Sequence, residues 1–199
     1  MIRFPNAKIN LGLRIVSRRP DGYHNLETVF YPIQLQDALE LVPTTDPTTS
    51  LTLSGIVING DSRDNLVMKA WRRLSERFDL PPVSIHLHKA IPFGAGLGGG
   101  SADAAFLLAM ACDYFHLPLS DEELDREAAA LGADCPFFLH NKPLLAKGIG
   151  DEFEQIGRAS CRERAGCSLS EGVPAGAGET GRGGTYGGGL FAGDSRRAR

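Results

Sequence analysis

The sequence lacks the long uncharged apolar run that a membrane-spanning helix requires. No window of about 18 such residues occurs among the 199, so we expect no transmembrane helix. The opening residues, Met1 to Lys8, contain no apolar stretch of the kind found in secretory signals, and we expect no such signal. The net charge of −3 is too small to favour nucleic acid or a membrane surface as partner.

Cysteine is scarce, and the 4 cysteines have irregular spacing. This spacing matches neither a zinc site nor a disulfide framework, so we expect reduced thiols and a cytoplasmic protein. Cys112 and Cys135 are interpreted as small packing residues rather than nucleophiles. His86 and His88 alternate with apolar residues on a predicted strand, and we interpret them as exposed or hydrogen-bonded rather than as metal ligands.

Residues 157–199 contain no lysine, few large apolar residues, 7 arginines and 12 of the 24 glycines. Such a segment buries too little surface to offset the entropy lost on ordering, so we expect a disordered tail after a folded domain at 1–156. Residues 156–164 can be encoded by DNA that resembles a common sequencing-library adapter. Our hypothesis is that this tail is not native sequence, and a genuine low-complexity tail is the alternative.

Strands are predicted wherever apolar and polar residues alternate. A half-buried strand is expected over 8–16, which places Lys8 and Asn10 on one face. A turn at 18–22, strands at 26–33 and 38–42, and a hairpin formed by 51–53 and 56–58 are expected to follow. Alternation predicts another strand over 83–87.

Helices are predicted from capping residues and from apolar stripes. Asp64 is expected to cap a helix over 65–78, where Val67, Trp71 and Leu74 begin a single apolar stripe. Residues 102–115 are apolar and helical in pattern. Ser120 and Glu123 form a capping-box pattern that opens a helix to about residue 131.

A glycine-rich segment, Pro92 to Ala105, lies between a predicted strand and a predicted helix. Glycines allow backbone N–H groups to approach an anion, and a helix N-terminus adds positive potential. A bound phosphate chain is the expected ligand, and Ser101 could offer its hydroxyl to a phosphate or to Mg²⁺. The alternative is a flexible connector or a tight strand-to-helix turn.

The residues that follow the glycines exclude one known type of phosphate-binding loop and weaken another. No lysine follows the glycines, so a Walker A loop does not fit. Gly94, Gly96 and Gly99 match G-x-G-x-x-G, but a dinucleotide-binding unit would next need a strand ending in an acidic residue. A dinucleotide-binding module therefore stays as a weaker alternative, which predicts a parallel sheet and NAD binding.

The segment Pro92 to Ala105 resembles the phosphate-binding motif of the GHMP kinases. More specific resemblance lies in Ala7-Lys8-Ile9-Asn10-Leu11, in Asp21-Gly22-Tyr23-His24, and in the segment 131–138. The resemblance runs from about Phe4 to about Phe153. It implies an α+β fold, the GHMP-kinase N-terminal domain, with a mixed sheet and packed helices.

The resemblance also implies a reaction. It points to the branch that transfers the ATP γ-phosphoryl group to the 2-hydroxyl of a cytidylyl sugar-alcohol, in the non-mevalonate route to isoprenoid precursors, with Mg²⁺ accompanying ATP. Asp134 matches the catalytic aspartate, which takes or orients the hydroxyl proton, and Lys8 matches its partner lysine. Without the resemblance, Lys8 would be interpreted as a solvated strand residue and Asp134 as a turn or cap.

Binding roles are implied in the same way. Asn65 and Leu66 are expected to border the adenine pocket, Tyr23 and His24 to recognise cytidine, and Asn10 to contact substrate or orient Lys8. The segment expected to bind ATP comprises Pro92, Phe93, Gly94, Ala95, Gly96, Leu97, Gly98, Gly99, Gly100, Ser101 and Ala102.

Members of this family are longer, with a second lobe and a third glycine-rich motif that do not occur in this chain. We therefore expect the second lobe to be missing and apolar surface to be exposed on the open face. Two alternative functions stay open: another GHMP kinase with a different alcohol substrate, and an inactive nucleotide-binding fragment. Expected partners are ATP and a small-molecule substrate, with the protein a monomer or a weak homodimer.

Overall fold

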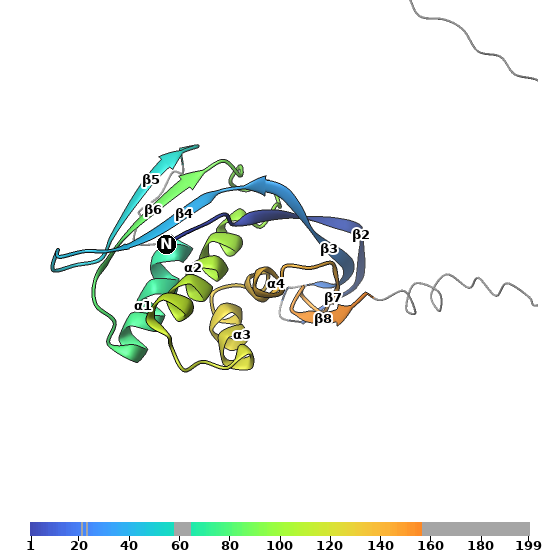
Figure 1. The fold of residues 1–199 in the computed structure, drawn as a ribbon. Coiled ribbons are helices and arrows are strands. Elements are labelled where there is room, and N and C mark those ends of the chain that lie inside the picture. Colours follow the sequence, from blue (N-terminus) through green and yellow to red (C-terminus); the bar gives the residue numbers. More distant parts are fainter. Residues whose placement is uncertain (21, 23, 58–64, 157–199) are drawn as a thin grey trace, which may run out of the picture.

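The computed structural model describes residues 1–20, 22, 24–57 and 65–156. The elements are β1 (Ile2–Arg3), β2 (Asn6–Arg18), β3 (His24–Gln36), β4 (Ala38–Pro43), β5 (Ser50–Gly55), α1 (Leu66–Phe78), β6 (Val83–Lys89), α2 (Gly99–Phe115), α3 (Asp121–Ala129), α4 (Cys135–His140), β7 (Leu144–Lys147) and β8 (Glu152–Gln155). The strands form a curved layer, and the helices cover one side of it (Figure 1). This arrangement confirms the expected α+β class.

The strands form two sheets. The first has the order β1-β4-β6-β5 and is mixed, because β5 runs parallel to β6 while the other pairs are antiparallel. The second has the order β2-β3-β7-β8 and is antiparallel throughout. The mixed sheet is as expected, and among the described residues the parallel sheet required by a dinucleotide-binding module is not present.

Two chain segments pass from one sheet to the other at the same place. The chain leaves β1 for β2 at Phe4 and Pro5, and it leaves β3 for β4 at Asp37. The backbone N–H of Asp37 donates to the carbonyl of Pro5 over 2.8 Å, so a hydrogen bond joins the two connecting segments. The two sheets consequently form one continuous surface, and the helices lie on one side of it (Figure 1).

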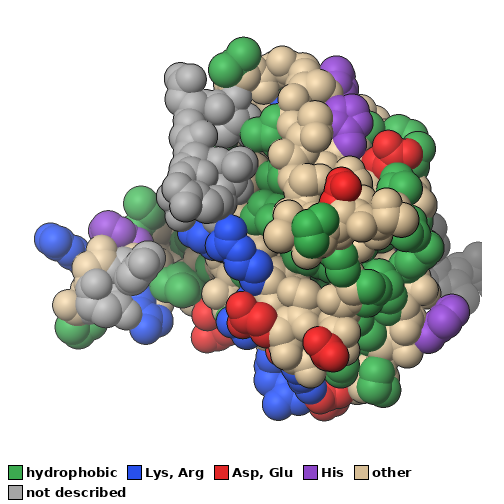
Figure 2. All heavy atoms as spheres, turned by 90° about the vertical axis from the view of Figure 1, so that its left-hand side faces the viewer, with side chains coloured by type: hydrophobic (Ala, Val, Ile, Leu, Met, Phe, Trp, Pro, Cys, Tyr) green, Lys and Arg blue, Asp and Glu red, His purple; other side chains and the backbone are tan. Residues whose placement is uncertain are grey.

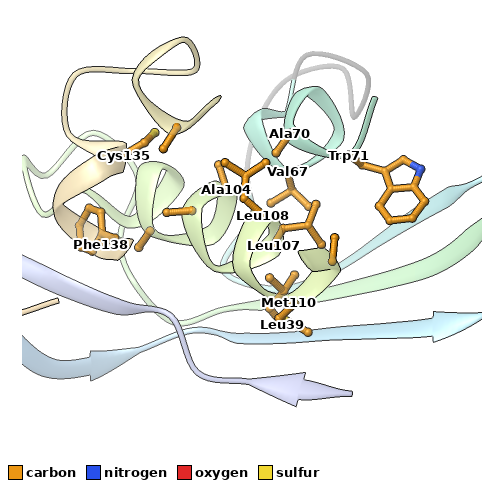
Figure 3. Close-up of a cluster of buried hydrophobic side chains, with 14 of the residues drawn as sticks. Leu39, Val67, Ala70, Trp71, Ala104, Leu107, Leu108, Met110, Cys135 and Phe138 are labelled. Atoms are coloured by element: carbon orange, nitrogen blue, oxygen red, sulfur yellow. The ribbon is translucent and has the colours of Figure 1, made fainter. Parts of the chain in front are cut away.

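Helix α2 lies at the centre of the core (Figure 3). Its buried side chains include Ala104, Leu107, Leu108 and Met110, which point toward different neighbours because the helix is apolar on most of its circumference. Figure 3 shows α2 between α1 and the sheet, with Leu39 of β4 below it. The start of α2, where the glycine loop ends, is therefore held by close packing on several sides.

The outer helices are fixed by their caps and by ion pairs. Ser120 and Glu123 form both hydrogen bonds of the predicted capping box at the start of α3. Arg77 of α1 pairs with Glu123 and Glu127 of α3, over 3.0 and 2.9 Å. Basic and acidic side chains lie beside one another on the lower part of the face that Figure 2 shows. Such exposed pairs orient the helices and contribute little stability each.

Three predictions about local structure were wrong. The predicted hairpin does not form over its described residues, because β5 pairs in parallel with β6 and residues 56 and 57 lie outside any strand. The cap of α1 is Asn65, whose side chain accepts from the N–H of Val67. Helix α2 begins at Gly99, so its first two residues are Gly99 and Gly100, which were expected to precede the helix.

The predicted half-burial of β2 holds only for its first residues. Ala7 and Lys8 are buried, whereas Leu11, Leu13 and Ile15 are 46, 55 and 65% exposed. A register shift follows Leu11, and beyond it the β2–β3 ribbon runs past the helices that cover the sheet (Figure 1). Exposed apolar side chains are therefore present on this ribbon.

Some predictions fall on residues outside the described part of the chain. These are the role of Tyr23, and the disorder and origin of the tail at 157–199. No helix of the described residues is both long and apolar enough to cross a membrane.

Candidate active site

Lys8 occupies a buried position near the start of β2. Its side chain is 5% exposed, and its ammonium lies 4.4 Å from the centre of the Phe30 ring. The Nζ atom donates to Oδ1 of Asn10 over 3.0 Å, which confirms that these two side chains share one face of the strand. A cation against an aromatic face and an amide oxygen is stabilised without a full hydration shell. Lys8 is therefore not a solvated strand residue.

Asp134 lies immediately before α4, at the N-cap position. Its side chain makes no capping hydrogen bond, so the carboxylate is not used to stabilise the helix. Instead Oδ2 lies 3.3 Å from Nζ of Lys8, and the side chain is 32% exposed. The structure thus brings together two residues that are distant in sequence, with the carboxylate still reachable from solvent.

The glycine loop leads from β6 into α2 and lies directly against Lys8. Gly94, Gly96 and Gly98 all have a φ near +73°, a conformation that glycine adopts without strain. The carbonyl of Leu97 accepts from the backbone N–H of Lys8 over 2.9 Å. An added Cβ at Gly94 or Gly96 would meet nothing within 4 Å, so this part of the loop faces open space.

The first turn of α2 offers donors to a ligand. Gly98 occupies the N-cap and provides no side chain to accept from the N–H groups that follow. The first N–H groups of a helix have no partner within the helix, and they favour an anion. The exposed loop and this helix start together present backbone N–H groups from which an anion such as a phosphate can accept hydrogen bonds.

The residues predicted to border the adenine pocket lie beside this loop. Asn65 and Leu66 begin α1, and a Cβ added at Gly100 would lie 3.8 Å from Cδ1 of Leu66. Ser101 lies in the first turn of α2 and is hydrogen-bonded to the thiol of Cys135. Burial raises the pKa of the Cys135 thiol to about 11, which makes it a poor nucleophile, as expected.

His24, which is predicted to bind cytidine, lies away from the loop. His24 is exposed at the first residue of β3, and in the ribbon register it pairs with Arg18, whereas Lys8 pairs with Pro32. The ribbon end is attached to the turn after β7, because the N–H of Leu26 donates to the carbonyl of Gly148 over 2.7 Å. The described residues therefore place His24 at the far end of the ribbon from Lys8.

Several residues of the site were not identified from sequence. Phe30 lies beneath the Lys8 ammonium, and Phe138 packs against Gly98, where an added Cβ would stand 2.8 Å from the ring. Gly150 approaches the other side of the pair, since its added Cβ would lie 3.6 Å from Oδ1 of Asp134. Phe30 lies opposite Asn10 in the register of β2 and β3. The sequence does not give this register, because bulges shift the pairing of the two strands.

The described residues contain no group of three or more His, Cys, Asp or Glu side chains able to hold a metal ion. Ser54 lies between His86 and His88, with its hydroxyl 2.9 and 3.0 Å from their ring nitrogens. The two histidines are thus hydrogen-bonded, in agreement with the interpretation made from the sequence.

Comparison with known proteins gives consistent matches. Residues 65–142 match the GHMP kinases N terminal domain. The chain is 58% identical over 158 residues to 4-diphosphocytidyl-2-C-methyl-D-erythritol kinase of Bacteroides fragilis, covering 78% of this chain and 58% of the relative. It is 55% identical over 156 residues to the protein of the same name in Parabacteroides distasonis, covering 78% and 57%. The chain therefore spans less than two thirds of the length of these relatives.

Solved structures agree with the fold. A crystal structure of 4-(cytidine 5'-diphospho)-2C-methyl-D-erythritol kinase matches with a TM-score of 0.68 and 38% identity, covering 78% of this chain and 55% of that one. A crystal structure of mevalonate kinase matches with a TM-score of 0.62 at 15% identity, over 79% of this chain and 56% of that one. The second match supports the fold alone.

Proposed function

We propose that this chain, whose residues 65–142 match the N-terminal domain of the GHMP kinases, serves ATP-dependent transfer of a phosphoryl group to an alcohol. One observation carries the proposal: Nζ of Lys8 lies 3.3 Å from Oδ2 of Asp134, and Lys8 is bonded to the glycine loop. Phosphoryl transfer requires a phosphate cradle, charge neutralisation and a group that handles the acceptor proton.

Each part of the site has a role in the proposed reaction. The phosphates of ATP rest on the loop and on the N–H groups of the first turn of α2. Asp134 takes or orients the proton of the acceptor hydroxyl, which its exposed carboxylate is able to reach. Lys8 keeps a positive charge beside that carboxylate and stabilises the negative charge that develops on the transferring group.

Magnesium fits this arrangement as a companion of ATP rather than as a resident ion. Among the described residues no cluster of acidic or imidazole ligands is present that could hold the metal by itself. The phosphates would supply most of its ligands, and the Ser101 hydroxyl at the start of α2 is the side chain available to complete the set. When bound, the ion neutralises phosphate charge.

We propose that the acceptor is the 2-hydroxyl of 4-diphosphocytidyl-2-C-methyl-D-erythritol, in the non-mevalonate route. The support is the name shared by relatives at 58 and 55% identity. Asn10 lies on the Lys8 face, and Tyr23 and His24 are assigned to cytidine on the resemblance alone. A cytoplasmic location, a monomer or weak homodimer, and a boundary between a domain at 1–156 and a tail at 157–199 belong to the same proposal.

A second candidate is nucleotide binding without transfer. It is favoured by the fact that the chain spans 58% of its relative in Bacteroides fragilis, whereas the loop and the Lys8–Asp134 pair lie wholly within the described residues. The two candidates share the ATP site and differ only in turnover.

The test measures binding and transfer separately on the 199-residue chain. Calorimetry gives the affinity for MgATP, and labelled γ-phosphate reports transfer to the cytidylyl sugar-alcohol and to a panel of other alcohols. In the variants Asp134→Asn and Lys8→Ala we expect transfer to fall by about 100-fold or more with ATP affinity largely kept. Matched controls are Asp113→Asn and Lys147→Ala, both partners in surface ion pairs.

The outcomes separate the candidates. Transfer that depends on Lys8 and Asp134 and is unaffected by the controls supports the kinase. Transfer to a different alcohol would show that the proposed substrate is wrong and that the proposed reaction is right. MgATP binding without transfer assigns the second candidate, and absence of binding refutes both.

A further inference from the structure

Phe30 is a buried aromatic residue of the candidate active site, and the proposed chemistry gives it no role. It lies in β3 and is 2% exposed. In the antiparallel register Phe30 lies opposite Asn10, while Lys8 lies opposite Pro32. Residues opposite each other share a face of the sheet, as do residues two apart on one strand. Phe30 and Lys8 are therefore diagonal neighbours, and the centre of the ring lies 4.4 Å from Nζ of Lys8.

The ring of Phe30 is held by the same helix that places Asp134. Phe137, in the first turn of α4, lies almost perpendicular to it, with ring centres 5.2 Å apart and planes at 75°. Phe153 of β8 lies 6.2 Å away on a further side. Helix α4 begins immediately after Asp134. One short helix thus orients both the ring that contacts Lys8 and the carboxylate that pairs with it.

The Lys8 ammonium lies among three described groups of different chemistry. It donates to Oδ1 of Asn10 over 3.0 Å, lies 3.3 Å from Oδ2 of Asp134, and faces the ring of Phe30. The distance to Asp134 is longer than the roughly 2.7–2.9 Å of a charge-assisted hydrogen bond. The face of an aromatic ring attracts a cation but carries no net charge and accepts no proton. The ring therefore attracts the buried ammonium without neutralising it.

We infer that Phe30 is a positioning residue for phosphoryl transfer, whose ring holds the Lys8 ammonium in place and limits its approach to Asp134. This inference rests on the proposed function. With the ammonium held in this way, the carboxylate stays available to the acceptor hydroxyl, and the positive charge stays beside the transferring group. Without the attraction of the ring, the flexible lysine side chain moves toward the partly exposed carboxylate and pairs with it more closely.

The alternative is that Phe30 serves packing alone, and the two roles depend on different properties of the ring. Packing depends on its size and shape, whereas attraction of a cation depends on the electron density of its face. Ring fluorines withdraw this density and change the shape little. Phe78 offers a matched control, because the guanidinium of Arg77 lies 5.0 Å from its ring at the far end of α1 from Asn65.

The test places phenylalanines with one, two or three ring fluorines at position 30 of the 199-residue chain, and measures transfer of the γ-phosphoryl group. We expect kcat to fall stepwise, by about tenfold over the series. The KM for MgATP should not change, because the backbone N–H of Lys8, and not its ammonium, is bonded to the glycine loop. Phe30→Leu, which has no ring face, should lose at least as much kcat. The same fluorine series at Phe78 should leave kcat unchanged.

A kcat that does not follow the fluorine series at position 30 would overturn the inference and leave the proposed kinase intact. Absence of transfer by wild type would instead refute the proposed transfer for this chain, and the urea midpoint then decides the inference. The midpoint should fall more steeply along the series with Lys8 present than in the variant Lys8→Met, where no cation faces the ring. Parallel trends in the two backgrounds would overturn the inference.

Discussion

The contact between Gly98 and Lys8 can be tested by adding a single methyl group. Gly96 and Gly98 have nearly the same positive φ, 73° and 72°, but different surroundings. An added Cβ at Gly96 meets nothing within 4 Å, whereas at Gly98 it stands 2.8 Å from Cζ of Phe138 and 3.3 Å from Cε of Lys8. The two alanine variants therefore share backbone strain and differ only in packing.

The magnitudes follow from these distances. Alanine in the left-handed region costs roughly 1–2 kcal/mol, which the loss of unfolded-state entropy offsets by about 0.4–1 kcal/mol. Gly96→Ala should therefore destabilise the chain by about 1 kcal/mol. Gly98→Ala adds overpacking against the buried ring of Phe138, which typically costs about 1–3 kcal/mol more. We expect a total of about 2–4 kcal/mol for Gly98→Ala.

Urea unfolding followed by tryptophan fluorescence measures both variants, since Trp71 lies in the core. Similar m-values would show that only stability has changed. Gly100→Ala is a further control, because its Cβ would stand at an ordinary 3.8 Å from Leu66 within a helix. Equal costs at Gly96 and Gly98 would refute the close approach of the loop to Phe138 and Lys8.

Three other predictions concern single side chains. Asn65→Ala removes the N-cap hydrogen bond from Val67 and should lower the free energy of unfolding by about 1 kcal/mol. An unchanged urea midpoint would contradict this prediction. Alkylation of Cys135 at about pH 8 should be roughly 100-fold slower in the native chain than in urea, because burial raises its pKa from 9.0 to about 11; similar rates by peptide mass spectrometry would contradict this. Burial raises the pKa of Asp103 to about 7, so the folded state binds a proton which the unfolded state has released. The free energy of unfolding of wild type should therefore fall on the order of 3–4 kcal/mol as pH rises from about 4 to about 7. If the difference in free energy of unfolding between wild type and Asp103→Asn does not vary with pH, this prediction is wrong.

Local signals in the sequence were sufficient for much of the fold. The capping box at Ser120 and the glycine loop depend on residues close in sequence; the box forms as predicted, and the loop forms but ends earlier, at Gly98. The side chains of Lys8 and Asn10 share a face because of strand periodicity alone, and the structure confirms it. These features require no knowledge of distant contacts.

Features that depend on tertiary structure could not be predicted in this way. The burial of β2 ends after Ile9 because the ribbon leaves the helical layer, which alternation of residues does not reveal. The approach of Lys8 to Asp134 was expected only from the family resemblance, since spacing gives no distance between a strand and a later helix. The buried ion pairs of Lys89 with Asp37 and Asp103 could not be predicted either, because each residue resembles a surface charge until the sheets and α2 are assembled.

The central claim is that the glycine loop and the start of α2 bind the phosphates of ATP. Hydrogen–deuterium exchange of the full chain with and without MgATP tests it most directly. The account predicts slowed exchange at 92–101 and at the start of α1, with no change in the exposed ribbon at 11–16. Unchanged exchange at 92–101 under saturating MgATP, or protection confined to other segments, would contradict it.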